Sequence, residues 1–477
     1  MSKMNILIVE PTNDWPSVYS YAKIPRLGPL RIAAEIRDAG HKVIVYSEAI
    51  SGPLENHWEL VNEANVIGIS AISAFAPDSY DLVQKIRQNY HREQKPIIGG
   101  GVHFTFAPDE ALGKGFDIIF RGPASIIFRK FLKNMQDLSI DGISYRIGDQ
   151  HFHNPDAPKK EDLNDLPAPA YETLHKPGNK WPIGFSGTLE GIRSCPHNCK
   201  FCTVWKMFGP VTMARPEIVI RDLRAMQDAL SPKTIIMADD NFTQKREKSL
   251  AIAEAINRAI KDQKIMPFGG LIQSSIKMSL DSVYLKALKV AFPNIAVGLE
   301  NFRSDSYKKR GSLEEVEEFF STLGAWGFHV HAMLIIEPDM AWEEVKRTVR
   351  ELRRLGAKSA QFTVLMPLPG SDLYNELVEK GDLDPKNQNW RNYNAFNPAP
   401  CYPAEMGDKM NYGWVGFNSP RLVFEKIGDM LKAGVNFERS AYHFVQSLAV
   451  WYPGMRWAWQ NRGLPGVLKA LKWSLMG

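Results

Sequence analysis

The sequence predicts an α/β protein in three parts: a doubly wound N-terminal domain, a partial barrel of six β/α units and a mainly helical C-terminal part. Two observations support this prediction. Short apolar strands alternate with helices both before residue 146 and after residue 183, and such alternation is typical of parallel sheets covered by helices. The 477-residue length accommodates about three domains of ordinary size.

The first alternation occupies residues 1–145, which we take as one domain. Ligands of doubly wound sheets bind at the carboxyl ends of the strands. Ser70, Ser73, Gly99 and Gly100 follow or end such strands, although a run of glycines also suits a plain tight turn. The expected strands are 4–10, 41–47, 65–73, 95–103 and 116–122, with helices at 28–39 and 78–90.

The second alternation, 184–385, follows a segment, 146–183, whose Pro, Asn and Asp content predicts a linker. It contains six β/α units, fewer than the eight of a complete barrel. The expected strands are 184–192, 234–239, 268–274, 294–300, 329–337 and 359–367. The expected helices are 217–230, 245–260, 281–291, 313–327 and 341–355.

The last part, 386–477, is loop-rich at first and reads as helical from Pro420 onward. Its final 27 residues contain four of the twelve tryptophans, with interspersed basic residues and no acidic residue. Such a helix suits either packing over the barrel mouth or contact with a membrane interface. The second alternative hints at a hydrophobic substrate.

Composition and charge exclude several classes of protein. The 58 basic and 53 acidic residues give a net charge of +5 that is spread along the chain, which does not indicate nucleic-acid binding. Four cysteines are too few for a disulfide scaffold of this length. The N-terminal MSKMNILIVEP reads as a strand and not as a signal peptide, so we expect a cytoplasmic, reducing location.

Three of the four cysteines lie together in RSCPHNCKFCTVW, residues 193–205. Thiolates bind soft metals and iron–sulfur clusters. Cys195, Cys199 and Cys202 can hold three irons of a cubane cluster and leave the fourth iron open. A structural zinc site is the alternative, with Cys401 or His197 as its fourth ligand.

This CxxxCxxC spacing, with an aromatic residue just before the last cysteine, resembles the radical SAM superfamily. The resemblance implies a partial (β/α)6 barrel in which Cys195, Cys199 and Cys202 hold a [4Fe–4S] cluster and Phe201 packs near the adenine of S-adenosylmethionine (SAM). The cluster would cleave SAM to a 5′-deoxyadenosyl radical, which abstracts a hydrogen from the substrate. Such an enzyme needs an external electron donor of the flavodoxin or ferredoxin type.

Further SAM contacts are expected at the ends of later barrel strands. Asp239 and Asp240, in MADDNF, offer a carboxylate for the methionine ammonium group. Gln273 and Ser275 end the third strand, and Glu300 ends the fourth, where the ribose hydroxyls need acceptors. A solvated loop or a helix cap is the alternative role at each position.

The N-terminal domain extends the resemblance to the cobalamin-binding subgroup of the superfamily. The segments that support it are RLGPLRIAAEIRDAGHKV (26–43), GISAIS (68–73) and GGGVHFTFAPDEAL (99–112). It implies a Rossmann-like domain of the cobalamin-binding type, with Ser70, Ser73, Gly99, Gly100 and His103 near the cofactor. Two features depart from the subgroup: residues 121–125 lack the two acids of its usual GEGE segment, and there is no DxHxxG motif.

The leading functional hypothesis is cobalamin-dependent C-methylation of an unactivated carbon on a hydrophobic small molecule or lipid. The alternative within the subgroup is an oxidative cyclase or other ring-forming enzyme that does not methylate. A more remote alternative is an iron–sulfur electron-transfer protein, although such cubanes normally use four cysteines. Cys401 is a candidate catalytic thiol or hydrogen donor.

Overall fold

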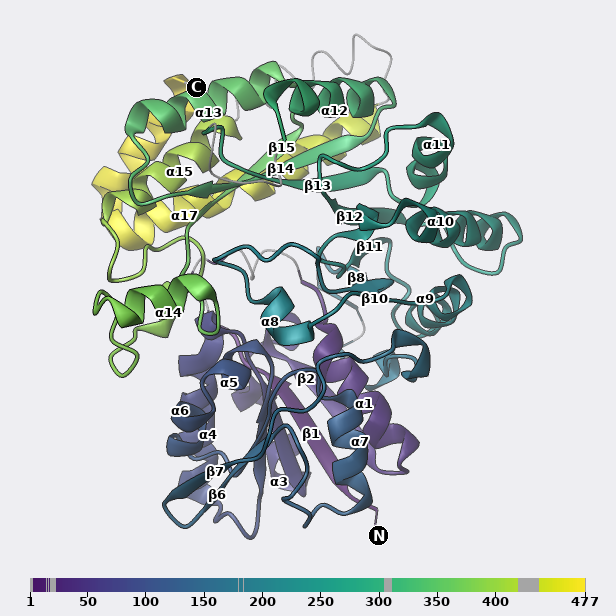
Figure 1. Cartoon of the computed structure of the whole chain (residues 1–477), viewed down its shortest axis with the longest axis vertical. Helices are drawn as coiled ribbons and strands as arrows, with labels where there is room; N and C mark the ends of the chain where they lie inside the picture. The colour runs from purple at the N-terminus through teal and green to yellow at the C-terminus, as the bar shows by residue number, and fades with distance from the viewer. Residues whose placement is uncertain are drawn as a thin grey trace.

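The computed structural model describes residues 3–13, 15, 17, 23–178, 180–182, 184–303, 311–418 and 437–476, with the side chains of 437–453 and 475–476 outside the description. In Figure 1 the N-terminal sheet domain lies below the partial barrel, and the C-terminal helices flank the barrel. The predicted fold class is confirmed. Part of the expected C-terminal helical segment, 419–436, lies outside the described residues.

The sheet domain has seven strands in the order β2-β1-β3-β4-β5-β6-β7, of which β1 to β5 run parallel. Its strands are mostly buried runs of β-branched residues, which suit a sheet covered on both faces. The strands are β1 Asn5–Glu10, β2 Lys42–Ser47, β3 Val66–Ser70, β4 Ile97–Gly100, β5 Ile118–Phe120, β6 Ile143–Ile147 and β7 Gln150–His153. The helices are α1 Leu27–Asp38, α2 Glu48–Ser51, α3 Trp58–Glu63, α4 Ala76–Asn89, α5 Val102–Phe106, α6 Pro108–Gly113 and α7 Ser125–Lys133.

The sheet domain extends beyond residue 145, where the composition had placed its end. Strands β6 and β7 form an antiparallel hairpin on the edge of the sheet, and Gly148 adopts a positive φ of 60° at its turn. The hairpin escaped sequence analysis because β7 is largely polar and exposed, so it lacks an apolar strand signal. The expected linker therefore begins only after His153.

The barrel is a parallel sheet in the order β8-β11-β12-β13-β14-β15, and it stays open between β8 and β15. Its strands are β8 Gly187–Leu189, β11 Thr234–Met237, β12 Gly269–Ser274, β13 Asn294–Glu300, β14 His329–Ile336 and β15 Ser359–Val364. A two-stranded ribbon, β9 Ile192–Arg193 and β10 Thr212–Met213, follows β8. The helices are α8 Val204–Phe208, α9 Pro216–Leu230, α10 Arg246–Lys261, α11 Ser282–Ala291, α12 Leu313–Ala325 and α13 Trp342–Arg354.

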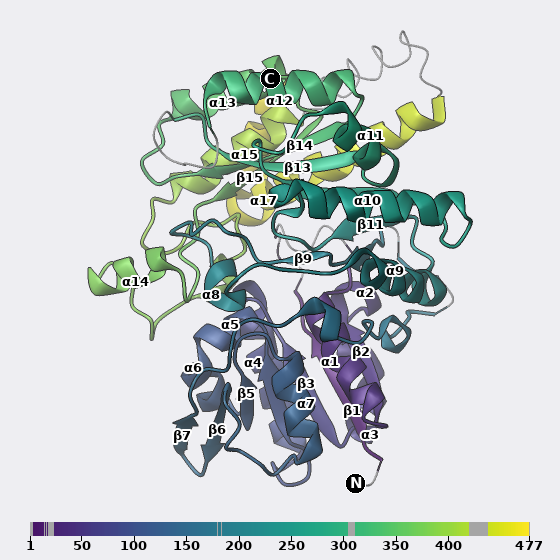
Figure 2. The same ribbon diagram turned by 45° about the vertical axis from the view of Figure 1, so that its right-hand side comes forward.

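The C-terminal part covers the outer side of β15. Helix α14 Asp372–Glu379 follows the last strand, and helix α15 Glu405–Phe417 packs against β15, with Gly413 directly over the Phe362 ring. Helix α17, Phe437–Met476, packs on α15 (Figure 2). It is interrupted at Gly463, whose φ of 59° and ψ of −157° are not helical. Among the residues that the structure describes, no helix is both long and apolar enough to cross a bilayer.

Candidate functional site

The three clustered cysteines lie on an irregular loop whose two ends are joined by the β9–β10 ribbon. Cys195 is buried, whereas Cys199 and Cys202 are half-buried, and the Cys202 amide donates to the Cys199 carbonyl at 3.0 Å. Ser194 starts the loop with a φ of 76°, and its hydroxyl donates to the Gly209 carbonyl at 2.6 Å. The loop is therefore fixed at its base, while the cysteine segment itself carries no regular secondary structure.

The three clustered cysteines offer the thiolate ligands of an iron–sulfur cluster. The four cysteines, all of which lie in the described ranges, form no disulfide. Within the described ranges, no three His, Cys, Asp or Glu side chains come close enough together to share one metal ion. A structural zinc needs such a group of ligands, whereas three thiolates of a cubane each bind a different iron. The donor set and its spacing thus fit the [4Fe–4S] cluster implied by the resemblance.

The segment MPLPGSDLY, 366–374, supports the cysteine loop from its other side. The Leu373 amide, in the first turn of α14, donates to the Lys200 carbonyl at 2.9 Å. Gly370 has a φ of 85°, and a Cβ there would lie 2.2 Å from the Phe106 ring of the sheet domain. The segment therefore joins the cysteine loop to both the barrel and the sheet domain.

A cavity of about 300 Å³ lies between the carboxyl ends of the sheet strands and the barrel. Strand order reverses at β1 and β3, so the cavity occupies the switch point where doubly wound sheets bind ligands. From the sheet domain it is lined by residues including Gly68, Ser70, Ile98, Gly99, Gly100 and Gly101. From the barrel it is lined by Glu190, Arg193, Met207, Phe208, Ala238 and Asp240.

The walls of this cavity fit cobalamin. A Cβ at Gly28 would meet no atom within 4 Å, and one at Gly100 would lie 4.0 Å from its nearest neighbour, so both glycines leave the backbone open to a ligand. The cavity wall that the sheet domain forms is mainly apolar, which suits the flat base at the end of the nucleotide tail of cobalamin. The barrel side carries Glu190, Arg193 and Asp240, whose charges suit the amide groups around a corrin ring.

Three of the five predicted cobalamin contacts, Ser70, Gly99 and Gly100, line the cavity. Ser73 and His103 do not. His103 is fully buried, and its two ring nitrogens bond the Ser73 hydroxyl at 3.1 Å and the Tyr80 hydroxyl at 3.0 Å. Burial lowers the pKa of His103 to about 3, so its imidazole stays neutral. The resemblance located the right segment, but this side chain turns into the domain core.

Asp239 does not have the exposed carboxylate expected of a SAM contact. It is fully buried, and Oδ1 accepts hydrogen bonds from the backbone amides of Gly191, at 3.0 Å, and Ile192. Burial, together with nearby Glu190, raises the pKa of Asp239 well above its usual value. Through these hydrogen bonds Asp239 connects the end of β11 to the turn before the cysteine loop. This arrangement is typical of a carboxylate that positions the backbone.

The other predicted SAM residues lie around the barrel mouth. Asp240 is half-buried and lines the cavity. Gln273 is half-buried between buried neighbours of β12 and so faces the barrel interior. Ser275 accepts the Lys277 amide at 3.2 Å, which matches the alternative role of a turn residue. Phe201 is half-buried in the cysteine loop.

Glu300 has an unusual backbone conformation at the end of β13. Its φ is 60°, and the pairing of β13 with β14 shifts register between Gly298 and Glu300. A left-handed conformation is uncommon for residues other than glycine, and such strained positions concentrate at functional sites. The bulge changes the direction in which the Glu300 side chain points, and this residue is only 8% exposed. Both features are compatible with the predicted contact of Glu300 with SAM.

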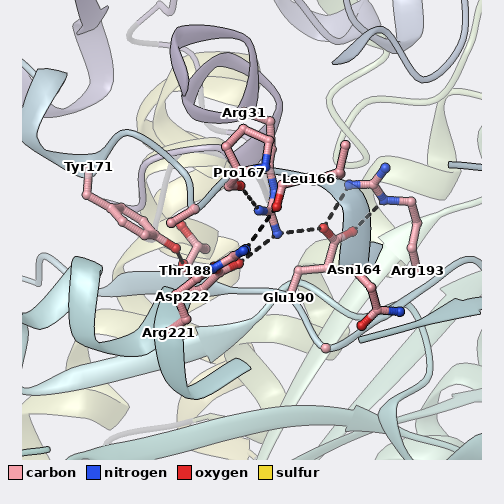
Figure 3. A network of polar contacts seen from close by, with 12 residues as sticks. Arg31, Asn164, Leu166, Pro167, Tyr171, Thr188, Glu190, Arg193, Arg221 and Asp222 are labelled. Carbon is pink, nitrogen blue, oxygen red and sulfur yellow. Dashed lines mark hydrogen bonds and ion pairs between the residues drawn. The ribbon is translucent and has the colours of Figure 1, made fainter. Parts of the chain in front are cut away.

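A set of buried charges, which we call the interdomain network, connects the sheet domain to the base of the cysteine loop (Figure 3). Arg31 on α1 lies 3.0 Å from Asp222 of α9 and 3.6 Å from Glu190, and it donates to the Pro167 carbonyl at 2.7 Å. Arg193 makes a two-pronged contact with Glu190 at 2.7 and 2.8 Å. The network consists of Arg31, Glu161, Glu190, Arg193 and Asp222.

Glu161 completes the network from the linker. One of its carboxylate oxygens accepts from Arg193 at 2.7 Å, and the other accepts the Ile126 amide at the start of α7, at 3.0 Å. A carboxylate is therefore present beside residues 121–125, where the sequence lacks both acids of the subgroup. Glu161 and Arg193 both line the cavity. Sequence analysis missed Glu161 because it lies in a linker with no periodic signal.

The electrostatics of Glu190 depend on its arginines. Burial opposes ionisation of this carboxyl, but Arg193 and Arg31 together lower its pKa. Glu10, at the end of β1, shows the contrast: burial raises its pKa to about 7, and the partly exposed Arg26, 3.8 Å away, lowers it too little to offset the burial. Arg26 also lines the cavity.

Cys401 lies apart from the other thiols in sequence, on the loop before α15. It is half-buried beside Tyr393 and Tyr402, and burial raises the pKa of its thiol. A thiol with a raised pKa stays protonated near neutral pH, which disfavours a nucleophilic role. The hypothesis of a hydrogen donor stays a prediction.

Two family models match the chain, one described as the B12 binding domain over residues 19–132 and one as the Radical SAM superfamily over residues 189–379. An uncharacterized methyltransferase of Pyrococcus horikoshii is 25% identical over 84% of this chain and 88% of its own length. The hopanoid C-3 methylase of Methylococcus capsulatus is 22% identical over 92% of this chain and 87% of its own. The cobalamin-dependent SAM radical enzyme OxsB, solved with aqua-cobalamin and SAM bound, superposes with a TM-score of 0.68 at 12% identity, over all of this chain and 75% of OxsB.

Proposed function

We propose that this chain, which belongs to the radical SAM superfamily and carries the B12-binding domain of one of its subgroups, is a C-methyltransferase acting on an unactivated carbon. When bound, the cluster and SAM supply a 5′-deoxyadenosyl radical and cobalamin supplies a methyl carrier. Cys195, Cys199 and Cys202 would hold the cluster. Ser70, Gly99 and Gly100 would line the cobalamin site.

The observation that carries this proposal is the shared cavity. Its walls come from the strand ends of the sheet domain and from Arg193, Met207 and Phe208, which flank the cysteine loop. A cofactor held there would lie against the segment that holds the cluster. The names of the two curated relatives, a methyltransferase and a methylase, agree with a transferred methyl group.

The reaction products test the proposal. Protein reconstituted without oxygen, and supplied with hydroxocobalamin, SAM and titanium(III) citrate, should release both S-adenosylhomocysteine and 5′-deoxyadenosine. A variant with alanine at the three clustered cysteines should release no 5′-deoxyadenosine. Release of 5′-deoxyadenosine without any S-adenosylhomocysteine would instead favour the ring-forming alternative.

The position of cobalamin has its own test, which needs no turnover. Gly28→Leu should fill the cavity and raise the Kd for hydroxocobalamin at least tenfold, since a Cβ at Gly28 enters open space at its edge. Gly324→Leu is the matched control, because Gly324 is also an exposed helical glycine with no atom within 4 Å of its Cβ position. Equal Kd values of the two variants for hydroxocobalamin would refute this position of the cobalamin. As a control, the two variants should contain the same amount of iron.

The substrate we propose is a hydrophobic small molecule or lipid, and the electron donor is a flavodoxin or ferredoxin. The hopanoid named for one relative motivates the lipid class. We place the protein in the cytoplasm with contact to a membrane surface through its C-terminal helix.

A further inference from the structure

The part of α17 after Gly463 has two opposite faces. Gly466, Ala470 and Ser474 recur every fourth residue and are buried, with Ala470 at 0% and Ser474 at 3% exposure. Leu464, Leu468 and Leu471 lie on the other side at helical spacing and are 58%, 58% and 37% exposed. We call these three residues the leucine stripe. Because it points away from the packed face, it is not part of the core.

Basic residues border this stripe. Lys469 and Lys472 are exposed beside it, and Lys469 also lies over the Trp473 ring at 4.9 Å. Between residues 454 and 474 the chain contains four basic residues and no acidic one. The surface thus combines aliphatic and cationic groups, which is typical of helices that lie in a membrane interface.

We infer that the leucine stripe docks the protein on the surface of an anionic lipid bilayer. A protein partner would more often offer a groove for such a helix, whereas a bilayer accepts a convex row of leucines and lets flanking lysines reach the headgroups. The positive border selects anionic lipid. This inference rests on the membrane contact proposed above and names its residues and its lipid, but it does not depend on the proposed chemistry, since it concerns the outer surface of a C-terminal helix.

Vesicle co-sedimentation of the full-length protein, without added cofactors, tests the inference. We expect the protein to sediment with phosphatidylglycerol vesicles and to partition at least tenfold less with phosphatidylcholine vesicles. Leu464→Ser, Leu468→Ser and Leu471→Ser combined should lower partitioning at least tenfold. Lys469→Glu and Lys472→Glu combined should remove the preference for anionic lipid.

Helix α11 offers a matched control surface. Val283 and Val290 are 60% and 55% exposed on one helix, with exposed Lys286 between them. Val283→Ser with Val290→Ser, and Lys286→Glu, should leave partitioning unchanged. The inference is overturned if the wild-type protein stays in the supernatant, or if the control variants lose binding as much as the stripe variants. It is also overturned if the stripe variants change a dimer into a monomer without any change in vesicle binding.

Discussion

Two of the contacts that join the sheet domain to the rest of the chain differ in the burial of their charges. In the interdomain network, Arg31 is 3% and Asp222 1% exposed. In the second contact, Arg391 is 33% exposed and pairs with Asp78 at 2.7 Å and with Asp81, which is 59% exposed, at 3.2 Å. Next to Arg391, Trp390 donates its indole N–H to Glu110 at 2.9 Å. We call this second contact the strap contact, after the segment between β15 and α15 that carries it.

The difference shows what each contact can do. An unpaired charge in a buried site is costly, so the interdomain network stabilises one arrangement of the sheet domain and the cysteine loop. Charges in a half-exposed site exchange their partner for water at little cost, so the Arg391 pairs contribute little to stability. Trp390 beside them is only 4% exposed, so the strap contact is held mainly by packing. We therefore expect the network, more than the Arg391 pairs, to fix the position of the cysteine loop.

Arg31→Met should give the largest loss of stability. It leaves Asp222 with Arg221 and Glu190 with Arg193 as their remaining cations, so the loss should approach, without exceeding, the roughly 3–5 kcal/mol of a broken buried ion pair. The thermal midpoint should fall by several degrees. Arg37→Met is the control on the same helix, because Arg37 is 36% exposed and pairs with exposed Asp38 and Glu172. Equal thermal midpoints for Arg31→Met and Arg37→Met would contradict the expectation that a buried ion pair contributes more to stability than an exposed one.

A second substitution sharpens this result. Glu190→Gln in the Arg31→Met background removes one of the two carboxylates that lost Arg31, so it should recover part of the lost stability. A further drop in the midpoint would mean that Glu190 is stabilised mainly by Arg193.

Glu161→Gln should have a smaller effect. The amide oxygen can still accept from Ile126, but Arg193 loses a charged partner, and a hydrogen bond to a charged group is worth about 1.5–3 kcal/mol. If the base of the cysteine loop is loosened, the backbone amides of this loop should exchange their hydrogens faster. Glu172→Gln, at a half-exposed pair, should not change that exchange.

The sequence predicted the strand alternation and the glycines that line the cavity because each signal is local. The role of the clustered cysteines stays a prediction, which rests on their spacing. The network escaped prediction because its partners are far apart along the chain: Arg31 reaches Pro167, 136 residues away, and Arg193 reaches Glu161, 32 residues away. A single arginine in a helix reads as a surface residue until its partners are known. Asp239 was selected for its charge, but β11 ends beside β8, where the backbone amides of Gly191 and Ile192 donate to its carboxylate.

Trp390→Phe should weaken the strap contact by about 1.5 kcal/mol, the low end of the range for a hydrogen bond to a charged group. The ring still packs on His103 and Tyr393, but Glu110 loses the indole N–H. Burial raises the pKa of Glu110, and the indole opposes that rise, so the substitution should raise the pKa further. The loss should therefore be greater at pH 8, where Glu110 is ionised, than at pH 5. Hydrogen exchange of the Tyr393 amide measures it, and a loss that does not vary with pH would contradict the role of the ionised carboxylate.

Arg391→Ala should have the smallest effect, at most about 1 kcal/mol, because the pair is partly exposed. Asp78 keeps the Asn13 amide at 2.6 Å, so no buried carboxylate is left alone. Since salt screens exposed charges, the difference from the wild-type protein in proteolysis of the segment 384–404 should shrink between 50 mM and 500 mM NaCl. The defect of Arg31→Met should persist over the same range, because its charges are not in contact with the salt solution. A defect of Arg391→Ala that is equally resistant to salt would mean that the strap contact is as fixed as the interdomain network, and the proposed division between the two contacts would be wrong.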